Sequence, residues 1–218
     1  MRRDDAIRTY KARRRVTAGQ AEAIERLLPR YGSHVRFSER APVPGRVAPL
    51  VLEIGSGMGE ATAAMAAADP DRDVLAVEVH TPGVGALLRR LEDAGLTNVR
   101  VAEADGLDVL RAQATASLAE VRVFFPDPWP KARHGKRRLV TAAFVDLVAD
   151  RLVAGGRLHV ATDWQPYAEQ VLGLLQGHPR LPLHSTDRGR RPLTRFEQQG
   201  LAAGRRAYDL VGLRPAGA

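Results

Sequence analysis

Residues 50–59 read Leu50-Val51-Leu52-Glu53-Ile54-Gly55-Ser56-Gly57-Met58-Gly59, an apolar run that leads into a glycine-rich turn. The run predicts a buried strand, and Gly55 and Gly57 predict a turn that a ligand can approach closely, because glycine has no Cβ. The spacing is GxGxG, unlike the GxGxxG of dinucleotide-binding enzymes, and no GKS or GKT follows to form a P-loop. Glu53 places a carboxylate inside an apolar strand. We interpret it as an acceptor for a ligand ammonium or for N–H groups of the turn.

Short apolar runs alternate with helical stretches from this point onward. The predicted strands are Leu50–Ile54, Val74–Val79, Val99–Ala102, Val121–Phe125 and Arg157–Thr162. The predicted helices are Glu60–Ala68, Val84–Ala94, Leu107–Ala114, Leu139–Val153 and Tyr167–Leu175. This alternation predicts an α/β fold with a doubly wound, mostly parallel sheet, and a late strand at Arg206–Gly212 is expected to add an edge. In such a fold the ligand binds beyond the carboxyl ends of the strands.

Acidic residues end the second and third predicted strands. Glu78 follows the glycine turn by about 20 positions, where an acid at a strand tip holds the two hydroxyls of a nucleoside ribose. Asp105 closes the third strand and is expected to face the adenine edge of the same ligand. Together with Glu53, these acids predict a site for a nucleoside-containing cofactor.

The segment Phe124-Phe125-Pro126-Asp127-Pro128-Trp129-Pro130-Lys131 follows the fourth predicted strand. Proline fixes φ and removes an N–H donor, so three prolines predict a stiff, extended turn that holds Asp127 in place. A fixed carboxylate beside the Trp129 ring suits a purine, because the acid accepts from guanine N1–H and N2–H while the ring walls the pocket. The alternative is a structural proline loop with Trp129 in the core.

A basic cluster comes directly after this turn. Its members are Lys131, Arg133, His134, Lys136, Arg137 and Arg138. Helix N-termini favour acids over cations, so a cluster just before a predicted helix favours a phosphate-binding role over an ordinary helix start.

The whole chain is basic and free of cysteine. It has 218 residues, a net charge of +8 and a pI near 10.6, which favours a polyanionic partner. No cysteine is present and the six histidines have no metal-ligand spacing, so we expect no disulfide and no metal site. The sequence has no secretory signal and no apolar run long enough to span a membrane, so we expect a cytoplasmic protein with no membrane partner.

The first 49 residues differ in pattern from the rest. Residues 1–16 are rich in arginine and predict a basic mobile arm. Residues 17–49 predict a short helix at Thr17–Leu28, with Thr17 as N-cap and Pro29 beyond its end, followed by a proline-rich linker. We expect residues 50–218 to form a single domain.

These motifs closely resemble the bacterial tRNA (guanine-N7-)-methyltransferases, a class I S-adenosylmethionine-dependent family, over nearly the whole chain. The segments that carry the resemblance are PRYG at 29–32, LEIGSGMGE at 52–60, EVHTPGVG at 78–85, FPDPWPK at 125–131, ATDW at 161–164 and RPLTRFE at 191–197. The resemblance implies a Rossmann-like sheet of seven strands with helices on both faces. It also implies methylation of N7 of guanosine 46 in the variable loop of tRNA.

The resemblance implies roles for individual residues as well. The cofactor S-adenosylmethionine would contact Glu53, Gly55, Gly57, Glu78, Asp105 and Asp127. The guanosine-bearing substrate would contact Lys131, Asp163, Thr194, Arg195, Phe196 and Glu197, and the RNA would contact Arg133, His134, Lys136, Arg137 and Arg138. We assign the catalytic role to Asp127.

Two alternatives for single segments and two for the function remain open at this level. Asp163 could instead cap the following helix, and residues 194–197 could be an ordinary polar surface loop. The PDPW segment also resembles the [DNS]PP[YFW] motif of methyltransferases that act on exocyclic amines, although only one proline separates Asp127 from Trp129 here. A non-catalytic RNA-binding module is the second alternative for the function, which the complete set of acids disfavours.

Overall fold

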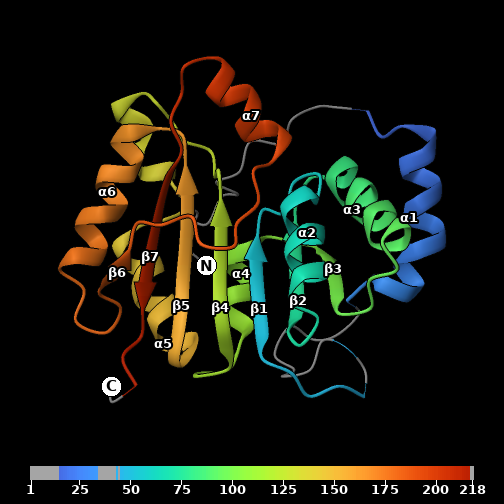
Figure 1. Ribbon diagram of the computed structural model, residues 1–218, viewed down its shortest axis with the longest axis horizontal. Coiled ribbons are helices and arrows are strands. Elements are labelled where there is room, and N and C mark those ends of the chain that lie inside the picture. Colours follow the sequence, from blue (N-terminus) through green and yellow to red (C-terminus); the bar gives the residue numbers. More distant parts are fainter. Residues whose placement is uncertain (1–14, 34–42, 44, 217–218) are drawn as a thin grey trace, which may run out of the picture.

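The computed structural model describes residues 15–33, 43 and 45–216 of the chain (Figure 1). Its centre is a seven-stranded sheet in the order β3-β2-β1-β4-β5-β7-β6. The strands are β1 Leu50–Ile54, β2 Asp73–Glu78, β3 Val99–Glu103, β4 Leu118–Phe124, β5 Leu152–Thr162, β6 Leu183–Ser185 and β7 Tyr208–Leu213. The first five run parallel, whereas β7 is antiparallel to both β5 and β6. The predicted doubly wound, mostly parallel sheet of seven strands is therefore confirmed.

Helices cover both faces of the sheet. They are α1 Ala18–Tyr31, α2 Glu60–Ala68, α3 Thr81–Asp93, α4 Gly106–Ala112, α5 Ala142–Arg151, α6 Gln165–Gln176 and α7 Arg195–Ala202, with a 3₁₀ helix η1 at Ala132–Arg137. One apolar core lies between the sheet and α4, α5 and α6, and a second lies between β1–β3 and α1, α2 and α3. Helix α7 belongs to neither layer and lies beyond the carboxyl ends of β4 and β5 (Figure 1).

The N-terminal helix begins where its sequence predicts and ends later. The Thr17 side chain accepts from the Gln20 backbone N–H while the Gln20 side chain accepts from Thr17, which is a capping box. The helix continues through Pro29 to Tyr31, so the prediction that it ends before Pro29 is wrong. Burial of Tyr31 in the second core, together with a Gly32 N–H bond to the Leu28 carbonyl, holds this last turn. Residues 1–14, most of the predicted arm, lie outside the described residues, as do positions 40–42 and 44 of the predicted linker.

Two expectations for the C-terminal third are corrected. The late strand β7 lies between β5 and β6, so the short β6 forms the edge in its place. Residues 195–202 form helix α7, where a polar loop was expected. Helix α5 also begins at Ala142, capped by Thr141, and the basic residues before it form η1.

The described residues contain neither a membrane-spanning helix nor a cluster of metal ligands. None of the helices there is long and apolar enough to cross a membrane. No group of three or more potential metal ligands occurs in that part of the chain.

Candidate active site

The glycine-rich turn joins β1 to α2 at the carboxyl edge of the sheet. Gly55, Gly57 and Gly59 have φ values of +78°, +56° and +77°, a backbone region that other residues rarely adopt. A Cβ on Gly55 or Gly57 would meet nothing within 4 Å, so space is open beside the turn. A Cβ on Gly59 would lie 2.8 Å from Leu87 Cβ, because this glycine packs directly on α3. The turn is thus closed on its helix side and open on its ligand side.

Glu78 holds the turn in place from the tip of β2. Its Oε2 accepts from the Gly57 backbone N–H at 2.7 Å and its Oε1 accepts from the His80 N–H at 2.9 Å. Each carboxylate oxygen has a second lone pair that can accept from a ligand hydroxyl. Glu78 therefore shapes the turn and can still bind a ribose.

Glu53 is a buried acid that lacks part of its hydrogen bonding. Its side chain is 2% exposed, and its Oε1 accepts from the Thr62 hydroxyl at 2.9 Å. Its Oε2 is buried with no hydrogen-bond partner. Burial raises the pKa of Glu53 despite the opposing charge of Arg122 on the neighbouring strand. A buried acceptor without a donor is costly, and a donor supplied by a ligand would relieve that cost.

Asp105 completes the acidic edge at the end of β3. Its Oδ1 accepts from the Leu107 N–H at 2.8 Å, which caps α4, and its side chain remains partly exposed. Because β1, β2 and β3 are neighbours in the sheet, their carboxyl ends bring the three acids to the same edge. The structure therefore brings Glu53, Glu78 and Asp105 together, as their spacing predicts.

The proline-rich turn continues this edge from the end of β4. Phe125 and Trp129 have φ values of +51° and +44°, unusual for residues with a side chain. Asp127 lies between them and is exposed. Trp129 is only partly buried, and the Arg137 guanidinium lies 5.0 Å from its ring centre. The ring is therefore a wall of the surface beside Asp127, and the alternative of a core tryptophan is disfavoured.

The basic cluster divides into two kinds of residue. Lys131, Arg133, Lys136 and Arg137 are exposed. Partial desolvation and then the positive charges of Arg137, Arg133 and Lys131 lower the pKa of His134, so at neutral pH it adds no charge.

Arg138 differs from the rest of the cluster. It is 8% exposed, and its guanidinium donates to the Pro128 carbonyl at 2.9 Å and to Gln170 Oε1 at 2.7 Å while lying over the Tyr167 ring. In this arrangement Arg138 ties the proline-rich turn to α6. Its contact with RNA stays a prediction.

Asp163 lies at the end of β5, the strand next to β4. It does not cap α6, whose N-cap is Trp164. Its Oδ2 pairs with Arg205 Nε at 3.2 Å, and the Arg205 guanidinium also lies 5.9 Å from the Phe196 ring centre. A cation from the segment after α7 thus holds this carboxylate at the carboxyl ends of β4 and β5, a part of the site that we call the mouth.

Helix α7 brings residues 194–197 to the same edge. The Thr194 side chain accepts from the Glu197 N–H and caps the helix, and the Arg195 N–H donates to both carboxylate oxygens of Glu60 at 3.0 Å. Phe196 is 49% exposed, and its ring centre lies 5.1 Å from that of Phe125. The helix therefore links the glycine turn to the proline-rich turn.

Glu197 points away from this mouth. It is buried and ion-paired with Arg188 and with Arg191, whose Nη1 lies 2.6 Å from Glu197 Oε2. Arg191 is completely buried and also donates to Asp209 at 2.6 and 2.7 Å. Burial opposes ionisation of Asp209, but the hydrogen bonds from Arg191 and His159 lower its pKa to about 2. Glu197 thus secures α7 to β7 through Arg191 in this structure, and its contact with the substrate stays a prediction.

Sequence reasoning did not find two residues that complete the site. Thr62 donates to Glu53, and Arg191 stacks against Phe124 and Phe125 at 5.7 and 5.1 Å while holding Glu197. The RPLTRFE segment contains Arg191, but nothing in its spacing marks that arginine as buried.

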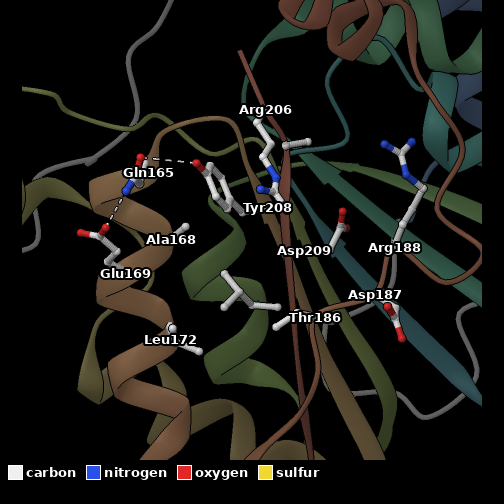
Figure 2. Close-up of a pocket in the computed structure, with 12 residues that line it drawn as sticks. Gln165, Ala168, Glu169, Leu172, Thr186, Asp187, Arg188, Arg206, Tyr208 and Asp209 are labelled. Atoms are coloured by element: carbon white, nitrogen blue, oxygen red, sulfur yellow. Dashed lines mark hydrogen bonds between the residues drawn. The ribbon is translucent and has the colours of Figure 1, made fainter. Parts of the chain in front are cut away.

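A cavity of about 400 Å³ lies next to this site, between α6, β7 and residues 186–188 (Figure 2). Its wall includes Gln165, which follows Asp163 by two positions, and Tyr208, which opens β7. None of the acids predicted to bind the cofactor lines it.

Comparison with known proteins agrees with this geometry. A family model described as "Putative methyltransferase" matches residues 47–210. The chain is 51% identical over 216 residues to the tRNA (guanine-N(7)-)-methyltransferase of Streptomyces coelicolor, with 94% of this chain and 80% of that protein covered. It belongs to the tRNA (guanine-N7-)-methyltransferase family. The family member of Nitrosospira multiformis is 48% identical over 220 residues, with 97% and 96% covered.

Solved structures place this family member in a wider fold group. The 16S rRNA methyltransferase KamB superposes with a TM-score of 0.60, covering 85% of this chain and 99% of that chain at 16% identity. At that identity the likeness shows the fold alone. The fold is the Rossmann-like α/β fold of class I methyltransferases.

Proposed function

We propose that this protein transfers a methyl group from S-adenosylmethionine to N7 of a guanine in tRNA, guanosine 46 of the variable loop. The observation that carries the proposal is the shared edge where the acids of β1, β2 and β3 meet the turn that bears Asp127. Membership of the tRNA (guanine-N7-)-methyltransferase family supports it. Because the proposed substrate is tRNA, we also infer a cytoplasmic location and no membrane partner.

The residues at this edge fit S-adenosylmethionine. The partnerless Glu53 Oε2 suits a donor from the cofactor, and the open side of Gly55 and Gly57 admits close approach. We assign the ribose to Glu78 and the adenine edge to Asp105. When bound, the cofactor supplies a methyl group already activated on a sulfonium sulfur.

The protein itself has to position the guanine and stabilise the charge that develops on it. Guanine N7 has an in-plane lone pair and carries no proton, so we assign no general base. The rate then depends on holding N7 close to and in line with the methyl group. Methylation gives the ring a positive charge, which a fixed carboxylate at Asp127 stabilises as it develops. We also assign Asp127 as the acceptor for the guanine N1–H and N2–H groups.

Asp163 and Phe196 border the same mouth and are proposed to contact the guanosine. The Arg205 ion pair and the Phe125 ring hold them in position. Thr194 and Arg195 are proposed to contact the guanosine as well, since their hydrogen bonds cap α7 and join it to Glu60 at the same edge.

Exposed cations beside the mouth are proposed to bind the RNA backbone. They are Lys131, Arg133, Lys136 and Arg137. Each cation placed on a phosphate releases condensed counterions, which gives salt-dependent affinity.

Methylation of an unmodified tRNA transcript with methyl-labelled S-adenosylmethionine tests the proposal. The expected product is 7-methylguanosine at position 46, identified by nucleoside analysis and mapping. N6-methyladenosine, or another exocyclic N-methyl product, would support the rival amine chemistry and refute ours. The absence of any methylated nucleoside would favour the non-catalytic module.

The Asp127→Asn variant tests the catalytic residue. It should lower turnover by at least about 100-fold, the scale of losing one electrostatic group in a transition state, while binding of S-adenosylmethionine largely survives. Asp146→Asn, which removes a 63% exposed carboxylate from α5, is the matched control and should leave turnover unchanged. Near-normal turnover of Asp127→Asn would refute the assignment.

A further inference from the structure

The cavity beside the site lies along a stretch of β7 that does not pair with β6. Strand β6 pairs with β7 at Val211 and Gly212, whereas the cavity is lined by Tyr208–Leu210, one step beyond that pairing (Figure 2). Its volume of about 400 Å³ is within the range of small-molecule sites. Gln165 of α6 lines the cavity and follows Asp163 of the methyl-transfer mouth by two residues.

Two consecutive arginines connect the mouth to the cavity. Arg205 pairs with Asp163 and lies over the Phe196 ring at the mouth. Arg206 lines the cavity and lies 5.6 Å from the Tyr208 ring centre. Both are exposed. The chain therefore presents one guanidinium to each space, and in each space that guanidinium stacks on an aromatic ring.

The polar groups that line the cavity carry both signs of charge. Arg206 is exposed and suits a phosphate, and Arg188 is a second cation of the lining. The exposed carboxylates of Glu169 and Asp187 would repel a phosphate but can accept hydrogen bonds from the amino and imino groups of a base. The Tyr208 hydroxyl and the Gln165 amide, 3.5 Å apart, add a polar pair (Figure 2). Bases also stack readily on guanidinium planes such as that of Arg206.

We propose that this cavity is a subsite for a second, unpaired nucleotide of the RNA, adjacent in sequence to the target guanosine. Its base enters between α6 and β7 against Arg206, and the phosphate that joins the two nucleotides lies between Arg205 and Arg206. The inference rests on the proposed function, since it takes the mouth at Asp127 and Asp163 to hold the guanosine. It adds a contact by which the enzyme selects a guanosine with an unstacked neighbour.

The test pairs cavity variants with tRNA transcripts that lack one base. Abasic transcripts are made at each position that flanks the target guanosine, and kcat/KM is measured for wild type, Leu172→Trp and Arg206→Ala. Leu172→Trp fills the cavity from α6 without changing charge, and Arg206→Ala removes the stacking guanidinium. Arg180→Ala removes another exposed arginine, four residues beyond the end of α6, and controls for net charge.

The wild-type enzyme should lose about 5- to 150-fold in kcat/KM with one abasic transcript, the range for losing one stacked base. Leu172→Trp and Arg206→Ala should show a loss of that size with the intact transcript and little further loss with the abasic one, because two changes to one contact are not additive. Arg180→Ala should behave like wild type. Thermal unfolding checks that the variants fold.

Additive losses in the two cavity variants, or an unchanged kcat/KM for both with intact tRNA, would overturn the subsite. Failure of the proposed function gives a different result, which is no 7-methylguanosine from wild type. In that event, filter binding of the same transcripts still decides whether the flanking base is held in the cavity.

Discussion

Replacing Glu53 by glutamine should stabilise the protein at neutral pH while weakening its binding of S-adenosylmethionine. Glutamine keeps the size of the side chain and an oxygen that can accept from Thr62. It removes a buried charge whose Oε2 has no partner. An unsatisfied buried group costs about 1–3 kcal/mol, and more when it is charged. Allowing for the amide N–H₂ left in its place, we expect a gain of about 1–2 kcal/mol in the free energy of unfolding, or about 2–8 °C in Tm for a domain of this size.

The gain should depend on pH in a definite direction. Burial raises the pKa of Glu53 above its ordinary 4.5, so the folded state binds this proton more tightly than the unfolded state does. The ionised carboxylate therefore costs stability at pH values above the raised pKa, and that cost disappears as the pH falls towards 4.5. The advantage of Glu53→Gln should be largest near pH 8 and should shrink as the pH approaches 5.

Glu120 on β4 provides the matched control. It is also fully buried, but Arg122 and Arg157 pair with it at 2.9 Å and Arg72 at 3.1 Å. Although burial acts to raise its pKa, Arg122 and Arg157 lower it to about 2. Glu120→Gln should therefore destabilise the protein by about 3–5 kcal/mol above pH 4.5, because it leaves the buried Arg122 without its counter-charge. Glutamine substitution of these two buried glutamates on neighbouring strands should thus change the free energy of unfolding in opposite directions.

Thermal unfolding at pH 8 and pH 5 measures stability, and titration calorimetry measures cofactor affinity. Loss of a hydrogen bond to a charged group should weaken binding by Glu53→Gln about 10- to 150-fold. The interpretation of Glu53 as a functional acid is refuted if the variant melts below wild type at pH 8 or binds S-adenosylmethionine as tightly.

Three further predictions concern the turn, the core and the RNA surface. Gly59→Ala should destabilise the protein by more than about 3 kcal/mol in thermal unfolding, because its φ is +77° and a Cβ would lie 2.9 Å from Leu87 Cα; Gly135→Ala, with open space around it, should be nearly neutral. Tyr167→Phe should cost about 1–3 kcal/mol in urea unfolding, since the buried Val140 N–H loses its 2.9 Å acceptor. Neutralising four cations together should reduce the slope of log affinity against log salt concentration, measured by tRNA filter binding, by up to about three units, at about 0.7–0.9 per phosphate. An unchanged slope would exclude that surface as the RNA-binding surface. These cations are Lys131, Arg133, Lys136 and Arg137.

The sequence predicts the first half of the fold closely, because its signals there are local. Strand Leu50–Ile54 and helix Glu60–Ala68 have the predicted bounds, since glycines end the strand and a long alanine-rich run forms the helix. The acids Glu78 and Asp105 could be assigned to one edge because successive parallel strands end on the same side of a sheet.

The C-terminal third was harder to predict because its signals are short. Strand β6 has three residues, too few to show a period. Helix α7 did have a signal: Thr194-Arg195-Phe196-Glu197 has the T-x-x-E spacing of a capping box, and Thr194 does cap the helix. Reading those residues as a polar loop overlooked this spacing. Burial of Glu197 depends on Arg191 and Asp209, which only the tertiary structure brings together.

The distribution of arginine shows why net charge alone overstates the RNA surface. Arg122, Arg138 and Arg191 are buried, and each is paired with a carboxylate or with carbonyl and amide oxygens. Arg122 and Arg191 are at most 3% exposed, so no phosphate reaches them. Arg138 and Arg191 hold segments of the mouth: Arg138 fixes the Asp127 turn to α6, and Arg191 fixes α7 and the Phe125 ring. The salt dependence of binding should therefore follow the exposed cations, whereas replacing Arg191 should lower turnover and stability without changing that slope.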